Sequence, residues 1–146
     1  MKFSINMKLK NQDALRTEAK KRMQKILFSS MLKMEEIAKR KAPVDTGNLK
    51  NKIHITPSEF GANKYTLSDG TSYGVYMEYG TKPHWVPIAP LKEWSRRVLG
   101  EEDAAYAVRN KIKEYGVNAQ PFFRPALHEV KRVWLPRYKN MDFGKP

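Results

Sequence analysis

The 146-residue sequence predicts an α+β fold, in which a long amino-terminal helix and shorter carboxyl-terminal helices pack on a small antiparallel sheet. Three observations predict it. Residues 12–41 contain neither glycine nor proline and carry apolar residues at steps of three and four. Short runs rich in tyrosine, threonine and isoleucine follow over residues 53–79, and helical spacing returns over residues 90–134. We expect one domain over residues 1–136 and a carboxyl-terminal tail over residues 137–146.

The amino-terminal third begins with a strand pattern and continues into the long helix. Residues 1–10 alternate between apolar and polar, which predicts a half-buried strand, and Asn11 suits the start of a helix. A helix over residues 12–41 would be about 45 Å long, whereas a compact domain of this length is roughly 40 Å across. We therefore expect the helix either to span the whole domain or to project toward another subunit. It ends where Pro43 disfavours helical geometry at the preceding residue.

The middle of the chain reads as turns and short strands. Residues 44–49 have the composition of a turn. Strands are expected around residues 53–56, 64–68 and 72–79. Asp69-Gly70-Thr71 predicts a hairpin between the second and third of these strands, because Asp-Gly is a strong hairpin signal.

The carboxyl-terminal part reads as helices separated by glycine and proline. Three prolines make the segment Gly80–Pro90 an irregular loop, and its last proline suits the first turn of a helix. Gly100 interrupts the helical pattern, which then continues to a cap at Gly116. A last helix is expected over residues 122–134, ending before Pro136.

The charge of the chain is strongly basic and unevenly distributed. Lysine and arginine number 28 against 15 acidic residues, a net charge of +13. Residues 1–56 carry +9, residues 57–89 carry −1 and residues 90–146 carry +5. Such a surface attracts polyanions or acidic protein surfaces in a salt-dependent way, although a merely solvated basic surface has the same composition. The residues expected to contact DNA or a partner are Lys20, Lys21, Arg22 and Lys25.

No arrangement of residues predicts catalysis, a metal or a cofactor. The sequence has no cysteine, and no apolar run approaches the roughly 20 residues needed to span a bilayer. Asp45-Thr46-Gly47 is the tripeptide of aspartic proteases, but the flanking Pro43 and Asn48 depart from their pattern, and a turn explains the same residues. None of the three histidines has a second ligand at metal-binding spacing; they are His54, His84 and His128.

Four short motifs nevertheless occur in a characteristic order. The segment Ala42–Leu49 follows the long basic helix, Tyr76-Met77-Glu78-Tyr79-Gly80-Thr81 is rich in tyrosine, Lys82-Pro83-His84 follows it, and Gln120–Ala126 comes late. With these motifs, residues 1–135 resemble minor tail proteins of long-tailed bacteriophages, namely the tail-completion or head–tail joining proteins. The motif positions are Pro43, Val44, Asp45, Thr46, Gly47, Leu49, Tyr76, Glu78, Gly80, Thr81, Pro121, Phe122, Arg124 and Pro125.

The resemblance implies a structural role in the virion and no enzymatic activity. It implies a ring of six subunits in the phage neck, assembled in the host cytoplasm, which completes the tail and joins it to the DNA-filled head. The implied partners are further copies of the chain, the head-completion, tail terminator and tail tube proteins, and the end of the phage DNA, with no membrane. Two alternatives stay open: a tail terminator ring, and a protein of another class that binds DNA non-specifically through charge.

Three motif residues carry individual expectations. Gly47 and Gly80 are expected to permit backbone angles that other residues resist. Arg124 is expected either to bind a carboxylate such as that of Glu78 or to make an interface contact. Other members of the similar family insert more strand after Gly80, so the local sheet is left open.

Overall fold

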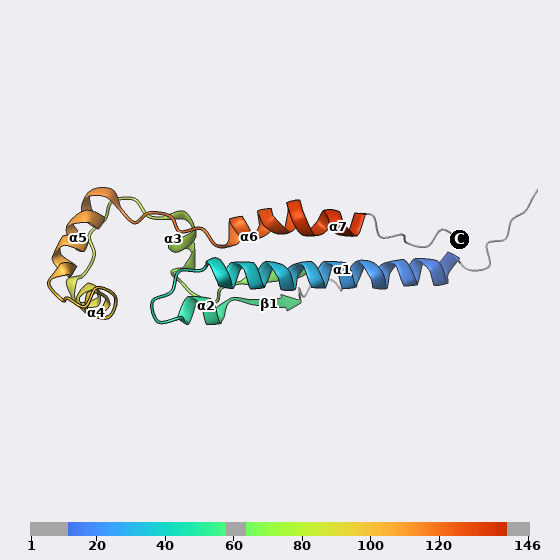
Figure 1. Cartoon of the computed structure of the whole chain (residues 1–146), viewed down its shortest axis with the longest axis horizontal. Coiled ribbons are helices and arrows are strands. Elements are labelled where there is room, and N and C mark those ends of the chain that lie inside the picture. The colour runs from blue at the N-terminus through green and yellow to red at the C-terminus, as the bar shows by residue number, and fades with distance from the viewer. Residues whose placement is uncertain (1–11, 58–63, 140–146) are drawn as a thin grey trace, which may run out of the picture.

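The computed structural model describes residues 12–57 and 64–139, and it shows an elongated molecule built along one long helix (Figure 1). In chain order the elements are α1 (Gln12–Lys41), α2 (Asn48–Lys52), β1 (His54–Pro57), β2 (Tyr65–Ser68), α3 (Gly74–Tyr79), α4 (Ile88–Val98), α5 (Ala104–Tyr115), α6 (Phe123–Glu129), the π-helical turn η1 (Val130–Trp134) and α7 (Leu135–Lys139). The predicted α+β class is confirmed. The strand expected over residues 1–10 and the cap at Asn11 lie outside the described residues.

The hydrophobic core lies against the carboxyl-terminal half of α1. There α6, η1 and α7 run alongside the long helix, and α2 packs near its end (Figure 1). The core residues are Ile37, Ala38, Ala42, Leu49, Ile53, Phe122, Ala126 and Val130. The amino-terminal end of α1 instead extends past α7 and beyond the body, and residues 16–23 are exposed. Of the two alternatives for the long helix, projection from the body is therefore the one observed.

Within residues 12–57 and 64–139 the sheet has two antiparallel strands, and the predicted hairpin is wrong. β1 pairs with β2, with Ile55 opposite Leu67, so the first two expected strands are partners of one another. The Phe28 and Tyr65 rings, 5.4 Å apart between centroids, join α1 to the sheet.

The third expected strand is the helix α3. The Asp69 side chain accepts a hydrogen bond from the Thr71 N–H at 2.9 Å, and the Thr71 hydroxyl accepts one from the Gly74 N–H at 3.1 Å. These two side chains bend the backbone into a helix start where a hairpin turn was expected. The helical turn places Gly74 and Glu78 together on a buried face, whereas a strand would have aligned Glu78 with Tyr76.

Helices α4 and α5 form a hairpin at the end of the molecule opposite the start of α1 (Figure 1). Ser95 and Ala105 are completely buried, consistent with close packing of the two helices. The break at Gly100 and the cap at Gly116 are confirmed. Residues 80–87 and 116–122 connect this hairpin to the body, and no extra strand forms there beyond a single bridge between Thr81 and Val117.

The last helical segment continues beyond the expected end at residue 134. It runs without interruption through Pro136 to Lys139. A proline ring clashes with the carbonyl four residues earlier in an α-helix. In the π-helical turn directly before Pro136, the Leu135 N–H donates to the Val130 carbonyl, five residues earlier. This wider turn accommodates the proline ring.

Candidate assembly site: the motif junction

Two motif segments that are 40 residues apart in the sequence meet in the structure. We call residues 76–81 and 120–126 together the motif junction. Its centre is the Glu78 carboxylate, which is buried beneath the start of α6. The backbone N–H groups of Phe122 and Phe123 donate to Oε2 at 2.7 and 2.8 Å, and the Arg124 N–H donates to Oε1 at 2.9 Å. One carboxylate thus satisfies three of the N–H groups that a helix start leaves without intrahelical partners.

The Arg124 side chain returns to the same glutamate. Its Nε donates to Oε1 of Glu78 at 3.0 Å, and its Nη2 donates to the Glu78 carbonyl at 2.8 Å. The guanidinium also stacks on the Tyr79 ring, 4.6 Å from its centroid. The contact expected between Arg124 and Glu78 is therefore present. The Arg124 side chain is still 55% exposed, so a second contact across an interface stays a proposal.

The pKa of Glu78 is lowered despite its burial. Burial alone raises this pKa, but the backbone hydrogen bonds from Phe122, Arg124 and Phe123, together with that from the Arg124 side chain, outweigh it. The pKa therefore lies below the usual glutamate value of 4.5. The junction consequently holds an ionised carboxylate at neutral pH.

Two glycines allow the connecting segments to cross at close range. Gly80 has a φ of 75°, and a Cβ there would lie 2.6 Å from the Val117 carbonyl oxygen. Gly116 has a φ of 77°, and a Cβ there would overlap the backbone of Thr81 and Lys82. The expected freedom at Gly80 is thus required both by its backbone angle and by the space around it.

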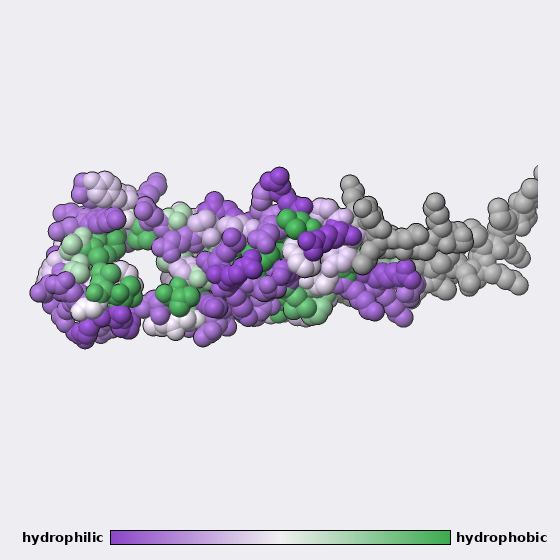
Figure 2. Space-filling view, viewed as in Figure 1, coloured by the Kyte–Doolittle hydropathy of each residue, from purple (hydrophilic) through white to green (hydrophobic). Residues whose placement is uncertain are grey.

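The Pro43–Leu49 motif forms the loop after α1 and the first two residues of α2. Gly47 has a φ of 80°, which confirms its expected backbone angle, and Leu49 is buried in the core. Val44 is 65% exposed and lines a pocket of about 460 Å³. The pocket is also lined by Met77 and Gln120 of the motif junction and by Trp94 and Val98 of α4. Figure 2 shows hydrophobic side chains on both sides of the opening between the α4–α5 hairpin and the body.

The aspartate of the protease-like tripeptide is an ion-pair partner. The Asp45 carboxylate accepts hydrogen bonds from Nη2 and Nε of Arg97 at 2.8 and 3.3 Å. The pair links the loop to α4 across the pocket, and the hydrogen bond that Arg97 donates to Asp45 raises the pKa of Arg97.

We expect Asp45→Asn to leave the fold almost unchanged, since both partners are solvent-exposed and water screens their attraction. The melting temperature measured by circular dichroism should shift by less than about 3 °C. A peptidase assay should find no activity in either protein. An activity present in the wild type and abolished by Asp45→Asn would instead support the protease interpretation.

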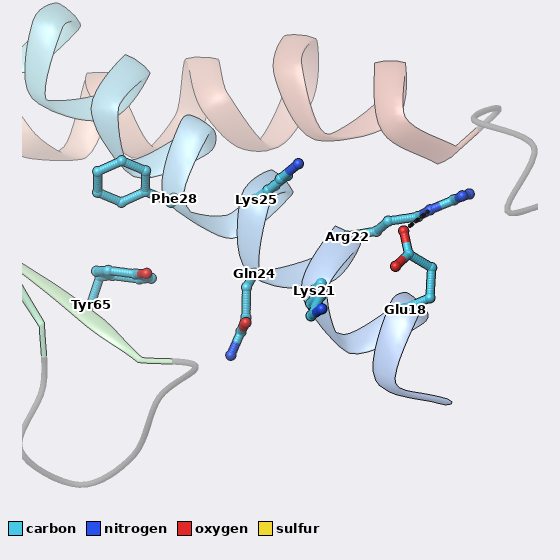
Figure 3. A pocket seen from close by; sticks show the side chains of 7 residues that line it. All are labelled: Glu18, Lys21, Arg22, Gln24, Lys25, Phe28 and Tyr65. Atoms are coloured by element: carbon cyan, nitrogen blue, oxygen red, sulfur yellow. Dashed lines mark hydrogen bonds and ion pairs between the residues drawn. The ribbon is translucent and has the colours of Figure 1, made fainter. Parts of the chain in front are cut away.

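The four expected DNA or partner contacts lie far from the motif junction, on the amino-terminal half of α1. Lys20, Lys21, Arg22 and Lys25 are all exposed. Lys21, Arg22 and Lys25 share one side of the helix, because Lys25 follows the other two by four and three residues. They line a pocket of about 380 Å³, in which Figure 3 shows Arg22 paired with Glu18, at 3.2 Å, while Phe28 and Tyr65 face each other at the opposite end. The structure therefore brings three of the four expected cations to one pocket, which Lys20 does not line.

The remaining candidate groups are dispersed. His54, His84 and His128 are all exposed. Within residues 12–57 and 64–139, no three histidine, aspartate or glutamate side chains lie close enough to hold a metal ion. None of the described helices is both long and apolar enough to cross a membrane.

Sequence reasoning missed two arginines. Arg97 lies 52 residues after its partner Asp45, and no local pattern links them. Arg109 stacks on the Trp85 ring, at 4.5 Å from its centroid. The spacing of Arg109 and Lys113, one helical turn apart, is the only signal that could have indicated a shared face.

The amino-terminal half of the chain matches a known family. Residues 8–80 match the family model described as "Bacteriophage HK97-gp10, putative tail-component". The match contains α1, the Pro43–Leu49 loop and the Glu78 side of the motif junction, whereas Gln120–Ala126 lies outside it. Comparison with curated proteins and with solved structures gave no match. Because the match covers half of the 146 residues, the chain belongs to the HK97-gp10-like family of bacteriophage tail components.

Proposed function

We propose that this tail component forms a ring of six subunits in the phage neck, where it completes the tail and joins it to the DNA-filled head without enzymatic activity. Membership of a tail-component family makes the chain a structural part of the virion. In the proposed ring the chain contacts further copies of itself and the head-completion, tail terminator and tail tube proteins.

The observation that carries the proposal is the exposure of large apolar side chains. Sixteen large hydrophobic residues are exposed among the described residues, whereas only nine hydrophobic residues are buried. Val44, Tyr76 and Trp85 are each more than half exposed. Single exposed apolar residues are common on monomers, but Val44 and Val98 line one pocket together with Met77 and Trp94, and grouped apolar surface of this kind marks a contact with another protein. Neighbouring subunits and adjoining tail proteins would cover it.

The shape and the charge support the same role. The amino-terminal end of α1 and the α4–α5 hairpin extend from opposite ends of the body (Figure 1). Each can reach a neighbour in a head-to-tail contact, and such contacts close into a ring when the rotation between copies allows it. The net charge of +13 suits a protein beside packaged DNA or acidic neighbouring proteins.

A ring predicts the same number of copies of this protein in every virion. Quantitative mass spectrometry of purified virions, calibrated with labelled peptides of this chain and of a tail protein of known copy number, should give about six copies, from the proposed ring symmetry. One or two copies per particle would contradict the ring.

Deletion of the gene separates completion from termination. Tails of normal length that fail to join heads are expected for a completion protein. Overlong tails would assign the ring to tail termination instead. Electron microscopy of lysates distinguishes the two results directly.

A second candidate function is charge-driven, non-specific contact with DNA. It is favoured by Lys20, Lys21 and Lys25, which are exposed and form no ion pair with the described residues. Binding to duplex DNA should then weaken steeply between about 50 and 200 mM salt. Absence of the protein from purified virions would favour this function over the structural one.

A further inference from the structure

Helix α5 carries an arginine that lacks a carboxylate partner among the described residues. The Arg109 guanidinium lies 4.5 Å from the Trp85 ring centroid and 5.5 Å from that of Tyr106. Its Nε is buried without a hydrogen-bond partner. Other arginines with a carboxylate in contact are Arg22, Arg40, Arg96, Arg97 and Arg124.

The two rings fix the guanidinium without satisfying its donors. Contact with an aromatic ring restrains the plane of the group but supplies no hydrogen-bond acceptor to its N–H donors. A guanidinium held in this way loses less entropy when it binds a carboxylate through two parallel hydrogen bonds. Lys113 adds a second positive charge, since its Nζ lies 5.6 Å from the Trp85 centroid. Trp85 and Tyr106 are 60% and 44% exposed, so a partner can approach this face.

The same chain presents carboxylates that lack a basic partner. In the turn between α4 and α5, Glu102 is paired with Lys92 and Arg96. Glu101 and Asp103 on either side of it are exposed and form no ion pair with any residue in the described ranges. Asp103 cannot serve Arg109 of its own chain, because six residues along a helix correspond to a rotation of about 240°.

We propose that Arg109 of one copy binds the Glu101–Asp103 turn of the next copy around the ring. The inference rests on the proposed ring and specifies one of its contacts. The proposed ring makes this contact head-to-tail, so each copy contributes Arg109 on one side and the turn on the other. Because Nε is buried, the bound carboxylate accepts its two hydrogen bonds from the terminal Nη1 and Nη2 groups, and Lys113 strengthens the attraction.

Charge reversal at Arg109 tests the contact in assembled particles. We produce each variant in cells infected by phage lacking the gene, and measure copies per particle by quantitative mass spectrometry. Arg109→Glu should lower incorporation more than about tenfold, and Arg109→Lys less, because lysine keeps the charge and loses the paired hydrogen bonds. The matched control is Arg137→Glu: Arg137 also stacks on a tryptophan, 4.8 Å from the Trp134 centroid, and lacks a carboxylate partner among the described residues.

Mixing variants separates a lost contact from a lost fold. The double variant Glu101→Arg, Asp103→Arg should fail alone, as Arg109→Glu does. Produced together, the two variants should assemble alternately. The glutamate of Arg109→Glu binds the reversed turn of the double variant, and the native Arg109 of the double variant binds the native turn of Arg109→Glu. A ring of six accommodates such alternation.

The outcomes distinguish this contact from the ring itself. Suppose that the wild type is present in about six copies per particle, the count set by ring symmetry. Normal incorporation of Arg109→Glu would then overturn the contact but not the ring. Failure of the mixed pair to assemble would also overturn it, because Arg109 would then act on another partner. Wild-type virions with one or two copies would overturn the ring.

Discussion

Replacing Glu78 by alanine should lower the free energy of unfolding by about 3–5 kcal/mol, because several backbone donors at the start of α6 lose the one carboxylate that they share. The variant leaves the N–H groups of Phe122, Phe123 and Arg124 without their acceptor. It also leaves the Arg124 guanidinium without its carboxylate. Each buried donor left unpaired costs about 1–3 kcal/mol, although water that enters the junction recovers part of this.

The measurement is thermal and urea unfolding followed by circular dichroism, in which the melting temperature should fall by about 10 °C. Glu93→Ala is the matched control, since Glu93 is an exposed glutamate in α4 that forms no ion pair with the described residues. It should leave stability almost unchanged. A loss at Glu78 no larger than that at Glu93 would show that the junction does not hold the carboxyl-terminal helices to the body.

The pH dependence of stability should report the same carboxylate. The pKa of Glu78 is lowered in the folded state from the ordinary value of 4.5. The folded state therefore binds this proton less readily than the unfolded state, and the stabilisation is fully present above the unfolded pKa. It is lost as the pH falls from 4.5 through the lower folded pKa. The free energy of unfolding is measured between about pH 3 and pH 7. In Glu78→Gln, the part of its pH dependence that comes from protonation of Glu78 should disappear.

The helices of this chain were predictable because their signals are local. Helix α1 covers residues 12–41, which contain no glycine or proline. Helix α4 ends just before Gly100, and α5 ends at the residue before Gly116. These boundaries depend on backbone geometry that each residue imposes on itself and its neighbours. Pro136 shows the limit of such reasoning, since a π-helical turn absorbs the proline and the helix continues.

The motif junction could be predicted only in part, because it depends on contacts between distant residues. Tyrosine and valine favour a strand at residues 72–79, yet the Glu78 carboxylate reaches the start of α6 from a helix. Tertiary contacts override a weak propensity of this kind. The Arg124 contact was foreseen as one of two alternatives, from charge complementarity alone. The three backbone hydrogen bonds to Glu78 have no sequence signal, since every residue except proline carries an N–H group.

A methyl group at Gly116 should destabilise the protein by about 3 kcal/mol, the sum of overpacking and of a backbone conformation, φ 77° and ψ −161°, that residues other than glycine rarely adopt. The φ of 77° already disfavours alanine, and the added Cβ would lie 2.8 Å from the Lys82 carbonyl carbon as well as against the Thr81 carbonyl oxygen. These atoms belong to the backbone. They cannot move away without disturbing the bridge between Thr81 and Val117 that joins the two connecting segments.

Gly100→Ala is the control without crowding, because Gly100 has a φ of 75° and nothing within 4 Å of an added Cβ. It should cost about 1–2 kcal/mol, less than Gly116→Ala, when the free energy of unfolding is measured in urea. Equal losses in the two variants would mean that the connecting segments separate without resistance. A ring contact through Arg109 could then not transmit a fixed orientation to the core.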